Sequence, residues 1–249
     1  MKAGEILPIN LFHGDSLELI KSIPDGLIDL TITSPPYNMN LRIRNGKHCS
    51  RQIVKELSTK YENYADNLSM DEYFDFNKNI INELLRVSKL TFYNIQFLTG
   101  NKSALYKLMG YFEQNIKEFI VWDKVNAQPA IGDGVLNSRF EAILVLSTKE
   151  DAISRKFQQA NFNRGCLENL WQIKRGKKIN KSHGAVFPEE LVETIINSFS
   201  CSGDHILDPF MGTGTTGVVA KKQDRVFTGI ELDRGYFEIA KSRIDYESR

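Results

Sequence analysis

The stretch DHILDPFMGTGTTGVVA, residues 204–220, decides the fold class of this 249-residue chain. An apolar strand ends in Asp208, a turn carries Gly212 and Gly214, and a helix follows with Thr215 in its capping turn. Glycine lets the backbone approach a ligand closely, and the helix points its positive end at that ligand. This order of strand, glycine turn and helix is typical of a nucleotide-cofactor loop in a doubly wound α/β fold.

A second strand supports this interpretation. The segment RVFTGIELD, residues 225–233, follows the helix and carries Glu231, where a doubly wound fold places an acid that binds the two hydroxyls of a ribose. A plain structural turn and an NAD loop remain alternatives, because Gly217 supplies the third glycine of a G-x-G-x-x-G spacing. The Asp208 carboxylate would repel a pyrophosphate but suits the ammonium group of a methionine moiety, so S-adenosylmethionine fits better.

Alternating strand and helix patterns predict a mostly parallel sheet with helices on both faces. We expect strands near residues 8–13, 28–33, 90–97, 117–122, 140–147, 204–208 and 225–231. We expect helices near residues 16–22, 71–88, 102–113, 187–200, 214–222 and 235–246. Residues 38–70 and 126–139 lack clear periodicity, and loops of this length are usually functional or disordered.

Length and composition predict one domain over residues 1–249, because a chain with 41% hydrophobic residues can bury one substantial core. No segment resembles a signal peptide or the apolar run of ~18 residues that a membrane span needs, which predicts a cytoplasmic protein. The three cysteines, Cys49, Cys166 and Cys201, show no metal-ligand spacing, so we expect no metal.

The stretch TITSPPYNMN, residues 31–40, ends a buried strand abruptly. Proline cannot donate to a β-ladder, and Pro36 keeps the backbone of Pro35 extended, so the strand must stop there. The loop then presents Ser34 and Tyr37 at the edge of the sheet, where a bound molecule can be held.

Charge is segregated along the chain although the net charge is only +1. Residues 41–60 carry six Lys or Arg and one acid (+5), and residues 147–182 carry nine and three (+6), so the rest of the chain sums to −10. Solvated surface loops are one explanation. The position of the first segment next to the SPPY edge favours a polyanion such as nucleic acid. We take the candidate contacts to be Arg42, Arg44, Lys47, Arg51, Lys174, Arg175, Lys177 and Lys178.

Two motifs together resemble those of DNA amino-methyltransferases of restriction-modification systems: DPFMGTGTT is similar to their S-adenosylmethionine loop and TSPPYN to their catalytic loop. The catalytic motif precedes the cofactor loop, which resembles the circularly permuted order of the family's β group. HGAVFPEELVETII, WDK and RFEAILVLS resemble further family segments, so the likeness runs from Leu11 to about Ile244. The resemblance implies a Rossmann-like fold in which the strands ending at Thr33 and Asp208 lie side by side and open into one crevice.

The resemblance also implies the roles of the site residues. The enzyme would flip the target base out of the duplex, with Tyr37 stacking on it and with Ser34 and the Pro35 carbonyl accepting the amine protons, so that the amine nitrogen attacks the sulfonium methyl in line. The catalytic set is Ser34, Pro35, Pro36 and Tyr37. The cofactor set is Asp15, Phe187, Asp208, Phe210, Gly212, Gly214, Thr215 and Glu231. Asp15 would bind the adenine amine, and a helix N-cap is the equal alternative for it.

Serine at the first motif position favours N4 of cytosine, and N6 of adenine is the alternative. Three other classes compete: a nicotinamide-dependent oxidoreductase, a non-enzymatic nucleic-acid-binding protein, and an RNA or protein-glutamine methylase. The oxidoreductase leaves SPPY and both basic segments unexplained. The permuted order and the basic segments favour duplex DNA, recognised through residues 38–70 and 147–182. The family's habit and the short recognition segment further predict a homodimer.

Overall fold

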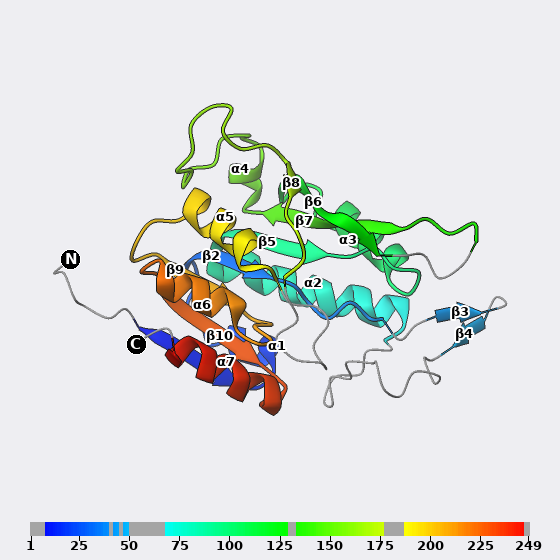
Figure 1. The fold of residues 1–249 in the computed structure, drawn as a ribbon, viewed down its shortest axis with the longest axis horizontal. Coiled ribbons are helices and arrows are strands. Elements are labelled where there is room, and N and C mark those ends of the chain that lie inside the picture. Colours follow the sequence, from blue (N-terminus) through cyan, green and yellow to red (C-terminus); the bar gives the residue numbers. More distant parts are fainter. Residues whose placement is uncertain are drawn as a thin grey trace.

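The computed structural model describes residues 8–39, 42–44, 47–49, 68–128, 133–176 and 187–246. Eight strands form one mixed sheet in the order β1-β10-β9-β2-β5-β7-β6-β8, and β3 and β4 form a separate hairpin (Figure 1). The strands of the large sheet are β1 (Ile9–His13), β2 (Ile28–Thr33), β5 (Ser88–Ile95), β6 (Ile116–Gln128), β7 (Ser138–Leu146), β8 (Leu170–Gln172), β9 (His205–Asp208) and β10 (Val226–Glu231). The hairpin consists of β3 (Arg42–Arg44) and β4 (Lys47–Cys49).

Helices cover the sheet. They are α1 (Ser16–Ile20), α2 (Met70–Val87), α3 (Lys102–Tyr111), α4 (Lys149–Ala152), α5 (Glu189–Phe199), α6 (Thr215–Lys222) and α7 (Arg234–Tyr246). One buried cluster joins α5, α6 and α7 to the sheet and contains Phe92, Phe199 and Phe227. The other joins α1, α2 and α3 to the sheet and contains Tyr93 and Leu105. The predicted architecture, a doubly wound and mostly parallel sheet with helices on both faces, is confirmed.

Local sequence explains the longest helix. Ser69 and Glu72 form a reciprocal capping box at the start of α2, with the Ser69 N–H donating to Glu72 Oε2 at 2.8 Å. Arg86 lies in the last turn, where its charge suits the helix dipole. The apolar side of α2 is fully buried at Ile80, Ile81 and Leu84, so this helix is core-facing scaffold, as the sequence predicts.

The two motif strands are neighbours. Strand β9 pairs in parallel with β2, with Leu30 opposite Ile206 and Thr31 opposite Leu207, and β10 lies on the other side of β9. Parallel neighbours end at the same edge of a sheet. The structure thus confirms that the strands ending at Thr33 and Asp208 lie side by side.

Several elements differ from the expectation. Strand β7 runs antiparallel to both β5 and β6. Strand β6 extends to Gln128 and β7 starts at Ser138, so part of the predicted irregular range 126–139 belongs to a hairpin. The short elements β3, β4, α4 and β8 were not predicted, because segments of three or four residues carry no readable periodicity.

No helix among the described ranges is long and apolar enough to cross a membrane. All described strands outside the β3–β4 hairpin belong to one sheet. The domain boundaries 1–249 remain a prediction.

Candidate active site

The catalytic loop and the glycine loop start from adjacent strand ends. The Thr33 hydroxyl, one residue before Ser34, donates a hydrogen bond to Asp208 Oδ1 at 2.9 Å. Asp208 in turn precedes the glycine loop that leads into α6. The two motifs, which are 175 residues apart in the sequence at this contact, therefore share one edge of the sheet.

Asp208 is buried, with 3% of its surface exposed. Besides Thr33, it accepts hydrogen bonds from the Thr216 hydroxyl (2.7 Å) and the Phe210 N–H (3.2 Å). Burial raises the pKa of this carboxyl to about 6, against the lowering effect of those donors. Asp208 thus holds the glycine loop against both β2 and α6, and its predicted contact with a cofactor ammonium remains a prediction.

The glycine turn needs its glycines for two reasons. Gly212 and Gly214 have φ angles of +52° and +81°, which L side chains rarely adopt. A Cβ on Gly214 would also lie 2.9 Å from the Cβ of Ala240, so glycine there lets α7 pack against the start of α6. Thr215 opens α6 and is 5% exposed, with Arg243 Nη1 3.4 Å from its hydroxyl oxygen.

Glu231 ends β10 beside this loop. One carboxylate oxygen accepts from the Gly212 N–H and the other from the Asp233 N–H, each at 2.8 Å. Burial raises the pKa of Glu231 to about 7, partly offset by these two N–H groups. Each oxygen keeps a free lone pair, so the carboxylate fits two hydroxyl donors such as those of a ribose.

The other predicted cofactor residues lie around this edge. The Gly14 N–H donates to the Glu231 carbonyl at 3.0 Å, which brings Asp15 near Glu231. Asp15 is the N-cap of α1, where Oδ1 accepts from the Glu18 N–H at 3.1 Å; its adenine contact remains a prediction. The rings of Phe210 and Phe187 pack on Phe76 and Trp122, with centroids 6.0 Å and 6.4 Å apart.

Helix α2 and the start of α3 fix the backbone of the catalytic loop. The Tyr73 hydroxyl donates to the Pro36 carbonyl at 2.9 Å, and Asn101 Nδ2 donates to the Tyr37 carbonyl at 2.7 Å. Asn38 has a φ of +55° and its Nδ2 donates to the Leu68 carbonyl at 2.8 Å. Sequence reasoning treated Tyr73 only as a core residue and missed Asn101.

The Ser34 and Tyr37 side chains join a polar network with the buried residues Asn94, Lys124 and Glu141. The Ser34 hydroxyl donates to Tyr37 Oη (2.6 Å), and the Tyr37 hydroxyl donates to Glu141 Oε2 (2.9 Å). Asn94 Nδ2 lies 2.6 Å from Tyr37 Oη and 2.7 Å from Glu141 Oε2, and Lys124 Nζ lies 3.1 Å from Glu141 Oε1. Burial, and then the charge of Glu141, raise the pKa of the Tyr37 hydroxyl well above its usual range, so Tyr37 stays protonated.

Sequence reasoning did not assign Glu141, Lys124 or Asn94 to the site. The sequence does contain a signal for Glu141. It is the one acid of β7, and the other residues from Phe140 to the end of that strand are apolar. A carboxylate in a buried strand needs partners and is therefore a candidate for function.

The backbone next to Lys124 is strained. Val125 has a φ of +64°, which is an outlier for a β-branched residue, and the register of β6 shifts after Asp123. Asp123 Oδ1 accepts from the Val125 N–H at 2.9 Å, and Arg139 donates to both Asp123 oxygens at 2.6 and 2.7 Å. The Arg139 contact holds the pKa of Asp123 far below its usual range.

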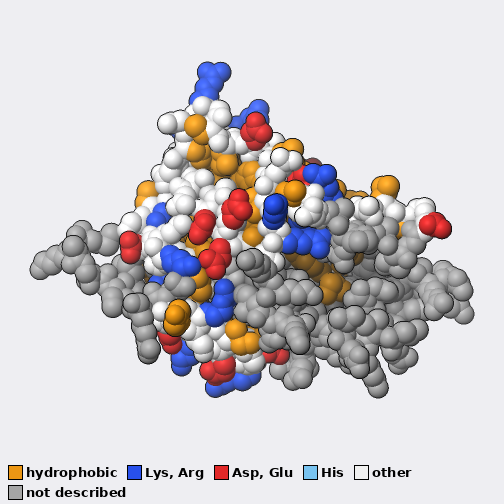
Figure 2. Space-filling model, viewed as in Figure 1, with side chains coloured by type: hydrophobic (Ala, Val, Ile, Leu, Met, Phe, Trp, Pro, Cys, Tyr) orange, Lys and Arg blue, Asp and Glu red, His pale blue; other side chains and the backbone are white. Residues whose placement is uncertain are grey.

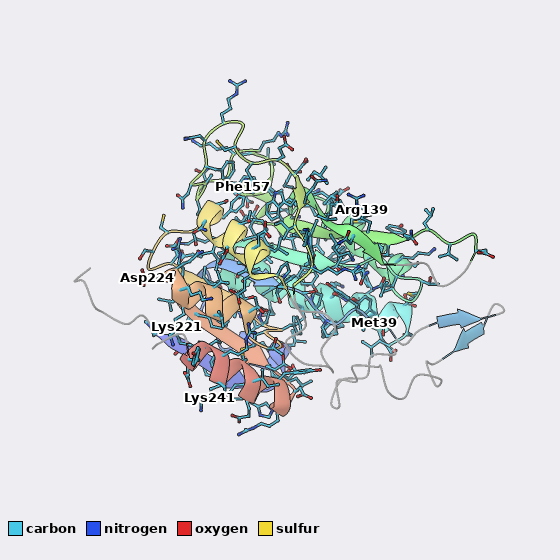
Figure 3. The ribbon with its side chains drawn as sticks, viewed as in Figure 1. Met39, Arg139, Phe157, Lys221, Asp224 and Lys241 are labelled. Carbon is cyan, nitrogen blue, oxygen red and sulfur yellow. The ribbon has the colours of Figure 1, made fainter. Side chains whose placement is uncertain are left out.

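Figure 3 shows Arg139 and Met39 toward the same side of the molecule, away from Lys221 and Asp224.

The predicted DNA contacts are described only in part. Lys174 and Arg175 are exposed just after β8. The backbones of Arg42, Arg44 and Lys47 lie in the β3–β4 hairpin, but their side chains, like all of Arg51, Lys177 and Lys178, fall outside the described residues. Basic and acidic side chains are mixed on the face in Figure 2. Within the described ranges, no group of three His, Cys, Asp or Glu side chains could hold a metal ion.

Comparison with known proteins gives consistent matches. Residues 28–242 match the model of a family described as DNA methylase. The type II methyltransferase M2.LlaDCHI of Lactococcus lactis subsp. cremoris is 31% identical over 94% of this chain and 88% of its own length. M2.DpnII of Streptococcus pneumoniae, also a type II methyltransferase, is 28% identical over 96% and 90%.

Solved structures share the fold. The PvuII DNA methyltransferase, named as cytosine-N4-specific, superposes with a TM-score of 0.68 at 19% identity, covering 96% of this chain and 89% of its own. M1.HpyAVI, solved as a complex with S-adenosylmethionine, gives a TM-score of 0.60 at 23% identity over 94% and 99%.

Proposed function

Because the chain belongs to the DNA methylase family, its reaction is methyl transfer to an exocyclic amine of a DNA base, and we propose that this amine is N4 of cytosine. The observation that carries the proposal is the hydrogen bond from Thr33 to Asp208. It places SPPY beside the glycine loop, so a base held by one and a methyl donor held by the other would meet. The oxidoreductase and non-enzymatic alternatives do not agree with the family.

The donor is S-adenosylmethionine, which the relative M1.HpyAVI binds in its solved complex. When bound, it supplies an electrophilic sulfonium methyl group. We assign Glu231 to the ribose hydroxyls, with Gly212 and Gly214 bringing the backbone close. Asp15, Phe187, Phe210 and Thr215 complete the proposed pocket. Asp208 ends β9 just before the glycine loop, and its second oxygen, which accepts from Thr216, keeps one lone pair for a cationic group.

The base would be held by the SPPY loop. An exocyclic amine inside a duplex cannot be reached, so the nucleotide must swing out of the stack. The Ser34 oxygen and the Pro35 carbonyl would accept the amine protons and raise the electron density on the nitrogen. The Tyr37 ring would stack on the base while its hydroxyl stays bonded to Glu141. Pro36 is fixed by Tyr73, which keeps the loop in place.

The choice of cytosine rests on Ser34. A hydroxyl is a neutral acceptor, and the amine of cytosine is already more polarised than that of adenine. N6 of adenine is the second candidate, because the family model covers both amines. Nucleoside mass spectrometry of DNA incubated with the protein and labelled S-adenosylmethionine tests this directly. The expected product is N4-methylcytosine; label in N6-methyladenine would move the assignment to the alternative, and label in RNA or protein would overturn DNA as substrate.

DNA is proposed to lie along the basic segments within residues 38–70 and 147–182. Exposed Lys174 and Arg175 support this for the second segment. Lysine and arginine near the base-flipping edge would bind phosphates and fix the position of the duplex.

We further propose that the chain acts as a homodimer. Tyr106 and Tyr111 are 58% and 56% exposed on α3, and Phe74 of α2 packs edge-on against Tyr111 with centroids 6.0 Å apart. Tyr73 on the same helix as Phe74 is 1% exposed and belongs to the core. We also propose that the protein acts in the cytoplasm, because DNA is its proposed substrate.

A further inference from the structure

Glu141 lies at the centre of a hydrogen-bond chain that ends at the proposed target base. The Glu141 and Lys124 side chains are 11% and 2% exposed, with 3.1 Å between Lys124 Nζ and Glu141 Oε1. Breaking such a buried pair is costly, because it leaves one charge without a partner. The ion pair with Lys124 therefore fixes one of the two Glu141 oxygens.

The other oxygen, Glu141 Oε2, sets the donor and acceptor roles of Tyr37, Asn94 and Ser34. An ionised carboxylate can only accept, so both groups next to Glu141 Oε2 must donate to it. These are the Tyr37 hydroxyl and the Asn94 amide nitrogen. Tyr37 has a single proton, and once that proton points at Glu141 the Tyr37 oxygen can only accept from Ser34 at 2.6 Å. The raised pKa of Tyr37 agrees with a hydroxyl that keeps its proton.

As a consequence, the Ser34 hydroxyl has no proton left to donate to a ligand. Its only proton points at Tyr37, and the Asn94 amide contacts the same oxygen at a weak 3.4 Å. A lone pair is what remains for a ligand. In the same network Asn94 Oδ1 is buried without a hydrogen-bond partner among the described residues, so a second acceptor also stands free.

We propose that Glu141 is a positioning residue that turns Ser34 into a hydrogen-bond acceptor and thereby makes the pocket select an amine over a carbonyl. This inference rests on the proposed function and deepens it. The base analogues that differ in this respect are uracil, which carries a carbonyl where cytosine has its amine, and hypoxanthine, which does so for adenine. A carbonyl facing the Ser34 lone pair would leave two acceptors in contact with no proton between them.

The variant Glu141→Gln tests the direction of the chain with little change of shape. Lys124 would hold the glutamine oxygen, so the amide nitrogen would face Tyr37. That nitrogen donates to Tyr37 and would also lie about where Asn94 Nδ2 now donates at 2.7 Å, so the Asn94 amide must turn its oxygen toward it. Tyr37 then accepts from the glutamine, and its proton is released to turn toward Ser34. Ser34 is left with a free proton that can meet a carbonyl. Tyr37→Phe breaks the same chain without touching Glu141.

The measurement is binding of two duplexes that differ only in the target base, the natural amine base or its carbonyl counterpart, in the presence of S-adenosylhomocysteine. A mispaired base flips more easily, but this effect is equal for all protein variants and cancels when their preferences are compared. Wild-type protein should prefer the amine duplex. Glu141→Gln and Tyr37→Phe should each reduce that preference by about tenfold or more, with unchanged affinity for S-adenosylhomocysteine.

The chain offers a matched control at the other end of β6. Lys117, with its side chain 0% exposed, pairs with Asp151 at 3.0 Å and lies at the start of β6, seven residues before Lys124. Asp151→Asn should change the melting temperature without changing the preference. An equal preference in wild type, Glu141→Gln and Tyr37→Phe, with methylation retained by the wild type, would overturn the inference alone. A wild-type protein that methylates no DNA would overturn the proposed function with it.

Discussion

Lowering the pH should weaken the binding of S-adenosylmethionine through Glu231. Burial raises the pKa of this carboxyl to about 7 in the free protein, from an ordinary 4.5. Two ribose hydroxyls donating to the carboxylate favour its ionised form and would lower the pKa of the complex. The free protein must therefore release a proton when it binds the cofactor, and acid opposes that release.

The size of the effect follows from these values. If the complex returns the pKa of Glu231 to its ordinary range, affinity should rise about fifteenfold between pH 5.5 and pH 7 by linkage. The rise is an upper bound, because it assumes that the bound hydroxyls lower the pKa of Glu231 all the way to its ordinary 4.5. Titration calorimetry in buffers of different ionisation enthalpy measures both the affinity and the protons released.

The control is Glu231→Gln, which keeps the size of the side chain and removes its titration. This variant should bind more weakly at pH 7, and its affinity should vary only a few-fold over the same range, since Asp208, with a pKa of about 6, still titrates nearby. A wild-type affinity that is flat between pH 5.5 and 7, or a variant with the full wild-type slope, would refute the reasoning about Glu231.

Four further expectations can be checked. Tyr37→Ala should sharply reduce methyl transfer while cofactor affinity stays nearly intact; equal activity would contradict the base-pocket assignment. Urea unfolding without cofactor should show that wild-type protein loses a few kcal/mol of unfolding free energy relative to Glu231→Gln between pH 5 and pH 8. A carboxyl whose pKa is raised in the folded state stabilises the fold below its unfolded pKa, and this contribution is lost as the pH rises through about 7. A difference between the two proteins that stays constant with pH would count against the raised pKa. DNA affinity should fall with salt at a log–log slope near −5 if the basic segments neutralise ~6 phosphates, and a flat dependence would make them a solvated surface. Light scattering at micromolar concentration should show a dimer, whereas a mass near 28.5 kDa that is unchanged on dilution would show a monomer.

Much of the fold could be predicted because local patterns of apolar and polar residues indicate its strands and helices. The apolar runs of β2 and β9, their ends at Thr33 and Asp208, and the amphipathic α2 all have clear periods and clear stops. The neighbouring positions of β2 and β9 followed from the doubly wound topology together with the motif resemblance. The reversed direction of β7 did not follow, because a strand buried on both faces reads the same in either direction.

The polar network could not be predicted because its contacts are remote in sequence. Tyr37 meets Glu141 across 104 residues, and no periodicity links the two. The same holds for the hydrogen bond from Asn101 to the Tyr37 carbonyl, which spans 64 residues. Residue types at single positions suggested a site at SPPY, but only the register of β5, β6 and β7 shows which buried side chains support it.

The position of Asp208 has a consequence for the order in which ligands bind. Its carboxylate bonds to Thr33 on one side and to Thr216 and the Phe210 N–H on the other, so the two binding loops share one buried group. A cofactor that displaces this carboxylate or changes its charge also changes the hydrogen bond that anchors the end of β2. Cofactor and DNA affinity would then be coupled, and thermodynamic reciprocity requires each ligand to alter the affinity of the other by the same factor. DNA affinity measured with and without S-adenosylhomocysteine gives that factor, and a value of one would mean that Asp208 holds the two loops together but carries no cooperativity between them.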